Sequence, residues 1–132
     1  MMRYWLALGA SNGLLSVAAG AFGAHALKGR LSEEMLAVFE TAARYQMYHA
    51  LALLAVGWLA SHAPSGRIHV AGWAFLCGVV LFCGSLYALS LSGVRAFGVV
   101  TPLGGIAFLI GWGVLAWSAL RPDWGAQHRT PS

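Results

Sequence analysis

The chain is organised around the segment FETAARYQMYHAL, residues 39–51, where polar residues enter an otherwise apolar sequence. Its polar members are Glu40, Arg44, Tyr45, Gln46 and His49. At about 100° per residue, the side chains from Glu40 through Arg44 and Tyr45 to His49 spread over about half the circumference of a helix. The segment is therefore interpreted as the polar entrance of a helix that continues in apolar residues to Ala60.

The chain around this segment is mostly apolar. Of its 132 residues, 59% are hydrophobic and only 9% are charged, whereas soluble proteins contain about 25% charged residues. Four apolar runs approach or exceed the roughly 20 helical residues that cross the hydrocarbon core of a bilayer. The eight Lys and Arg residues are scattered, which argues against a nucleic-acid surface. The composition predicts a single-domain integral membrane protein.

The apolar runs predict an all-α, four-helix transmembrane bundle with short hairpin loops. Its helices are expected at about 4–27, 42–60, 68–91 and 97–120, with an amphipathic lead-in at 32–41 and an exposed tail at 121–132. Ser32 is suited to be the N-cap of the second helix. Thr101 and Pro102 fit an N-cap and a first helical position, although a proline kink inside a longer helix fits equally well. The first run is longer than a signal-peptide core, so a retained helix is predicted.

Small residues recur at helical spacing in the first and last runs. In lipid, such rows let helix backbones approach closely, and this interpretation is preferred to a phosphate-binding glycine loop, which needs a preceding strand. Cys77 and Cys83 fall on different sides of one helix, which argues against a disulfide between them. The predicted helix-packing positions are Gly9, Gly13, Ser16, Gly20, Ala24, Gly104 and Gly105.

Four spans place both termini on one side of the membrane. The interfacial tryptophans agree, because Trp5, Trp58, Trp73, Trp117 and Trp124 all fall toward the termini. The basic residues tie, with Arg3, Arg67, Arg121 and Arg129 on the termini side and Lys28, Arg30, Arg44 and Arg95 on the other. If Arg44 is held within the membrane, the termini side leads by one and cytoplasmic termini are favoured. Dual topology remains open.

Several polar residues are expected to converge at the opposite end of the bundle. This candidate cluster comprises His25, Glu40, Arg44, Tyr45, Gln46, His49, Ser85, Tyr87 and Thr101. Glu40 and Arg44 have the spacing of an i,i+4 ion pair, and the alternatives are a proton or ion path and a docking site for a partner.

The remaining polar residues give little support to a metal site. His25 and His49 are on the same side, but a convincing third ligand is lacking, so no metal and no other cofactor is predicted. Asn12 is expected to donate an interhelical hydrogen bond. His62, His69 and His128 are expected to be solvated.

No catalytic motif stands out in the sequence. A G-x-S-x-G nucleophile elbow, a P-loop, paired catalytic carboxylates and a haem-attachment motif are all missing. We therefore do not expect an enzyme. A membrane enzyme is the third choice, and a polar cavity that holds a lipid headgroup or a quinone would favour it.

Four ordered motifs resemble those of the YgdD/YwdK family of small inner-membrane proteins, which has eukaryotic relatives and no known function. The motifs are GAFGAHAL (20–27), FETAARYQMYHAL (39–51), LFCGSLYAL (81–89) and TPLGGIAFLIGW (101–112). The resemblance runs from about Ala7 to Leu120. It implies a four-helix protein of the bacterial inner (cytoplasmic) membrane and supplies no substrate or catalytic residues.

The leading functional hypothesis is a structural or accessory membrane protein that packs in or against a larger membrane complex. It rests on the many small residues and on the lack of a catalytic set. The alternative is a small oligomeric transporter or channel lined by the polar cluster of the second helix. The expected partners are the lipid bilayer and either further copies of the chain or a larger complex, but not nucleic acid.

Overall fold

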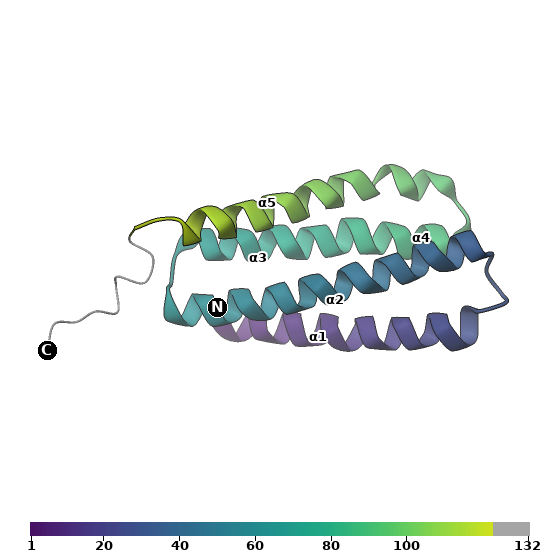
Figure 1. The fold of residues 1–132 in the computed structure, drawn as a ribbon, viewed down its shortest axis with the longest axis horizontal. Helices are drawn as coiled ribbons and strands as arrows, with labels where there is room; N and C mark the ends of the chain where they lie inside the picture. The colour runs from purple at the N-terminus through teal and green to yellow at the C-terminus, as the bar shows by residue number, and fades with distance from the viewer. Residues whose placement is uncertain (123–132) are drawn as a thin grey trace, which may run out of the picture.

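The computed structural model describes residues 1–122, which form four long helical rods joined by short connections (Figure 1). The first rod is α1 (Met2–Phe22) continued by the π-helical turn η1 (Gly23–Leu27), and the second is α2 (Glu33–His62). The third is α3 (Gly66–Gly78), a π-helical segment η2 (Val79–Cys83) and α4 (Gly84–Ser92), and the fourth is the 3₁₀ helix η3 (Arg95–Val99) with α5 (Thr101–Ala119). The predicted all-α four-helix fold is confirmed.

Three rods are long and apolar enough to cross a membrane, namely Met2–Leu27, Gly66–Ser92 and Arg95–Ala119. The second rod, α2, is more polar and does not reach that apolarity. α2 nevertheless extends over the same depth as α1, because the two helices pack antiparallel along their length. Gly57 contacts Leu6 near one end, and Phe39 contacts Gly23 near the other. The four rods therefore form one membrane-spanning unit.

The rods lie side by side in chain order, with α1 and α5 at the two edges (Figure 1). The second rod contacts the first along one side and the third along the other, and α5 packs on α3 and η2. The N-terminus, the turn between α2 and α3 and the end of α5 lie at one end of the unit (Figure 1). We call this the termini end, and the opposite end the loop end.

Sequence-local signals set most helix boundaries. The Ser32 hydroxyl accepts a hydrogen bond from the backbone N–H of Met35 at 3.2 Å, so the predicted N-cap is confirmed. Gly29 and Gly93 adopt positive φ angles where the first and third rods end, a conformation that suits glycine.

Two expected boundaries differ from the structure. The second helix is continuous from Glu33, so residues 33–41 of the expected lead-in and the span expected from 42 belong to one uninterrupted helix. Thr101 does not cap α5; its hydroxyl lies 2.6 Å from the Ser85 hydroxyl instead. Residues 97–100 belong to a 3₁₀ turn and its end, in which Phe97 and Val99 are exposed.

Glycines allow close helix contacts at particular positions. A Cβ atom at Gly9 would lie 2.9 Å from the Ala50 carbonyl oxygen, and one at Gly104 would collide with the backbone of Phe82. Gly13 and Gly105 have only ordinary contacts at 4.0 Å. Gly20 has open space on its Cβ side and Ala24 is exposed, so the close approach expected at these two positions is not made.

Candidate polar sites on the two faces of the second helix

A chain of hydrogen bonds joins three rods through the inward face of α2. Gln46, which is 6% exposed, donates from Nε2 to Oδ1 of Asn12 on α1 at 3.1 Å. Its Oε1 accepts a hydrogen bond from the Tyr87 hydroxyl on α4 at 2.8 Å. Asn12 also donates to the Leu8 carbonyl of its own helix. Gln46 therefore ties α1 to α4, and Asn12 is the acceptor of the interhelical bond rather than the donor that was expected.

His49 lies one helical turn further along the same face, inside a box of aromatic rings. Its ring stacks on Phe108 with centroids 3.6 Å apart, and the rings of Phe75 and Trp112 lie against it. Nδ1 is 2.7 Å from the Tyr45 carbonyl, which can only accept, so Nδ1 carries the proton. Nε2 then accepts the indole N–H of Trp112 at 3.1 Å. Both ring nitrogens are used, which fixes a neutral tautomer and leaves neither free for a metal ion.

Other polar contacts tie the remaining helices together. Ser85 of α4 and Thr101 of α5 share the hydroxyl contact described above. At the termini end, Trp5 donates its indole N–H to His69 Nδ1 at 2.9 Å. His69, expected to be solvated, is half-buried, and its Nδ1 provides the acceptor that the buried Trp5 indole needs.

The position of Trp112 in the sequence could have indicated that its indole N–H forms a hydrogen bond inside the protein. Among the tryptophans of the apolar runs, Trp112 lies inside a run rather than at its end. An indole N–H far from the interface must find an acceptor within the protein, but nothing local indicates that the acceptor is His49.

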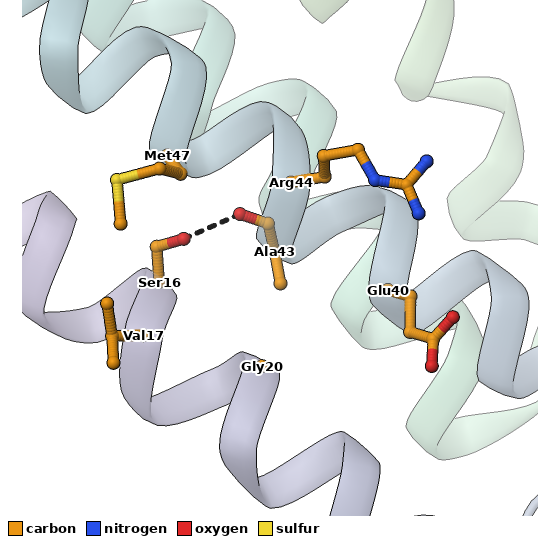
Figure 2. Close-up of a pocket in the computed structure, with 7 residues that line it drawn as sticks. All are labelled: Ser16, Val17, Gly20, Glu40, Ala43, Arg44 and Met47. Carbon is orange, nitrogen blue, oxygen red and sulfur yellow. Dashed lines mark hydrogen bonds between the residues drawn. The ribbon is translucent and has the colours of Figure 1, made fainter.

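The outward face of α2 carries two charged residues beside a shallow hollow of about 290 Å³. We call it the α1–α2 hollow; it is lined by Ser16, Val17, Gly20, Glu40, Ala43, Arg44 and Met47. Glu40 and Arg44 are both exposed, and Figure 2 shows them extending from α2 with no interaction between them. The ion pair expected between them is not formed: among the described residues, the salt bridge within 4.0 Å joins Arg95 to Glu34.

The depth of these charges follows from the register of α1 and α2. Ser16 donates to the Ala43 carbonyl at 2.6 Å (Figure 2), which places Arg44 beside Ser16. Ser16 lies 13 residues from Arg3 and 12 from Lys28, about 20 Å and about 18 Å along the helix. The Arg44 backbone is therefore near the middle of the span. Glu40 is one turn, about 6 Å, nearer the loop end, and both positions fall within a hydrocarbon half-thickness of about 15 Å.

The expected convergence of polar residues at the loop end divides into separate groups. Gln46 with Tyr87, His49 with Trp112, and Ser85 with Thr101 are hydrogen-bonded contacts between helices, whereas Glu40, Arg44 and Tyr45 are exposed and make no such contact to another described helix. His25 is exposed in η1. Ala50, the neighbour of His49 in the chain, lies beside Gly9 and Gly13, which precede His25 by 16 and 12 residues, or about 24 Å and about 18 Å along the helix. A metal site shared by His25 and His49 is therefore excluded by distance. Across the described residues, no group of three His, Cys, Asp or Glu side chains is placed to hold a metal ion.

Trp124, His128 and Arg129, which entered the sequence predictions, lie outside the described residues. Within residues 1–122, Cys77 is exposed and Cys83 is buried, and both are free thiols, as their spacing predicted.

Four antiparallel rods, apolar outer surfaces and internal hydrogen bonds define a small helical integral membrane protein. The chain belongs to the DUF423 family, a protein family of unknown function, whose model matches residues 19–105. A UPF0382 membrane protein of Staphylococcus epidermidis is 47% identical over 91% of this chain and 98% of its own length. The UPF0382 membrane protein YwdK of Bacillus subtilis is 45% identical over 91% of this chain and 98% of its own length. No solved structure matches the chain.

Proposed function

We propose that the protein is a structural or accessory component of a membrane assembly, which acts by packing against a partner within the bilayer. The observation that carries this proposal is the outward face of α2, where Glu40 and Arg44 are exposed at membrane depth without a mutual ion pair. Charged groups in hydrocarbon are costly and usually pair or face protein. A partner that covers the α1–α2 hollow supplies such an environment.

The inward face of α2 supports the same proposal. Gln46 and His49 direct their hydrogen-bonding groups to neighbouring helices, as residues that fix helix packing do. Neither the described geometry nor the relatives favour the transporter or channel alternative.

The test is affinity purification from native membranes in mild detergent. The wild-type chain should recover a reproducible companion, which is either another copy or a different membrane protein. The double variant Glu40→Gln, Arg44→Gln should lose that companion, whereas the matched control Arg30→Gln, which removes an exposed charge at the loop end, should retain it. A strictly monomeric wild type with no companion would contradict the proposal.

We further propose that the protein resides in the bacterial cytoplasmic membrane with both termini in the cytoplasm. Its relatives are membrane proteins of bacteria. With Arg44 near mid-span, the basic residues outside the membrane number four on the termini side and three on the loop side, which favours this orientation. A reporter enzyme that is active only outside the cytoplasm should be inactive when fused to the C-terminus and active when inserted after Gly29; the opposite pattern overturns this orientation.

A further inference from the structure

Most outward surfaces of the helical unit are apolar and suit contact with lipid, but one part of the surface is not apolar. The outward residues of α1 include Leu14 and Leu15, and those of α5 include Leu109 and Ile110, all more than half exposed. These apolar surfaces need only acyl chains around them. The outward face of α2 continues in the same way through Leu51 and Trp58, but at Glu40 and Arg44 it carries charges.

Glu40 and Arg44 carry opposite charges, lie one turn apart on one face of α2 and do not form an ion pair with each other. A surface with this arrangement is complementary to itself. A twofold axis along the membrane normal, which keeps both copies in the same orientation, brings Glu40 of each copy to Arg44 of the other. Two ion pairs form, and all four charges leave the lipid.

The shape of the α1–α2 hollow leaves room for a helix of a second molecule. Gly20 has nothing within 4 Å of its Cβ position, so the space beside it is open. Val17, which is 62% exposed, and Met47 provide apolar contacts around the charges. Small residues beside polar ones are the composition of helix interfaces in membranes.

We infer that the α1–α2 hollow is the interface of a parallel homodimer in which Glu40 and Arg44 pair across a twofold axis. This inference rests on the proposed packing function and names its partner as a second copy of this chain. A second copy fits better than an anionic lipid, because a lipid phosphate satisfies Arg44 but repels Glu40, whereas a second copy neutralises both.

Charge exchange between copies tests the pairing. In a dimer of Glu40→Arg chains, Arg faces Arg across both contacts, and in a dimer of Arg44→Glu chains, Glu faces Glu. When the two variants are mixed, both contacts of the mixed dimer join an Arg of one chain to a Glu of the other, so the mixture should associate although neither variant associates well with itself. The double variant Glu40→Arg, Arg44→Glu restores Arg opposite Glu at both contacts between its copies.

The measurement is energy transfer between differently labelled full-length chains in liposomes of neutral and anionic phospholipid, with Arg30→Gln as the matched control. Wild type and control should associate, and each single variant should associate about tenfold or more weakly. The double variant Glu40→Arg, Arg44→Glu should associate with itself about as well as wild type. Circular dichroism of each variant establishes that its helices are intact.

The outcomes separate this inference from the proposed function. Wild-type chains that stay monomeric in liposomes but recover a different protein from native membranes overturn the homodimer and leave the packing function standing. Wild-type chains without any companion in either setting overturn both. Association that persists in the single variants, or that is not recovered in the double variant, places the dimer contact elsewhere and overturns the charge pairing.

Discussion

The inward and outward faces of α2 both carry polar residues at similar depth in the membrane, but these residues differ in burial and in hydrogen bonding. On the inward face, Gln46 and His49 are buried and each bonds to two groups. On the outward face, Glu40 and Arg44 are exposed and do not pair with each other. The inward groups are uncharged when bonded in this way, whereas the outward groups are charged.

This difference indicates that the two faces of α2 have different roles. Uncharged side chains with complementary partners can be buried at little cost and fix which helices are neighbours. Charged side chains on a lipid-facing surface favour association with another molecule. The inward face should therefore govern the stability of the monomer, and the outward face its assembly.

The largest effect on stability is expected at His49. Replacing His49 with Ala leaves a cavity beside Phe108 and removes the acceptor of the Trp112 indole. The free energy of unfolding should fall by about 2 to 4 kcal/mol, measured by denaturation in mixed micelles at dilutions where the chain is monomeric. The matched variant Tyr48→Ala removes a half-exposed ring from the outward face and should cost far less. Equal losses in the two variants would erase the distinction between the faces.

The next effect is expected where α1 meets α2. At Gly9, any side chain meets the Ala50 carbonyl and Leu54, so Gly9→Leu should destabilise the monomer by about 1 to 3 kcal/mol through overpacking. At Gly20 the space is open, and Gly20→Leu should leave the monomer nearly unchanged while it fills the hollow and weakens self-association. Denaturation and energy transfer measured on both variants distinguish these effects; a destabilised Gly20→Leu monomer contradicts the open hollow.

A smaller effect is expected from the hydrogen bonds of Gln46. Gln46→Leu should lower the free energy of unfolding by about 1 kcal/mol, since membrane interhelical hydrogen bonds contribute about 0.6 kcal/mol on average and rarely more than about 1.7 kcal/mol. Combined with Tyr87→Phe in a double-mutant cycle, the two losses should be less than additive, because both remove the 2.8 Å bond. Strict additivity would show that this bond adds no stability.

The smallest effect on the monomer is expected on the outward face. Glu40→Gln and Arg44→Gln remove charges that form no salt bridge within 4.0 Å among the described residues. Neither should lower the stability of the monomer measurably, although both should weaken assembly. A marked loss of monomer stability in either variant would show that the charge has a role within the chain and would break the comparison between the two faces.

The number and order of the helices follow from signals that are local in the sequence. Apolar runs of membrane-spanning length end at charged and turn-forming residues such as Lys28, Gly29 and Gly93. The Ser32 cap could be predicted for the same reason, because its partner is only three residues away. The four ordered motifs also indicated the family, since they depend on residue order alone.

The roles of the polar residues, in contrast, depend on how the helices pack. The contact that the Thr101 hydroxyl makes and the acceptor that receives the Trp112 indole N–H are both set by rotation and register between helices. Helical periodicity shows which residues of one helix share a face, but it does not show what the neighbouring helix presents to that face. For this reason, FETAARYQMYHAL could be recognised in the sequence as polar, while its division into a bonded inward face and a charged outward face required the packed bundle.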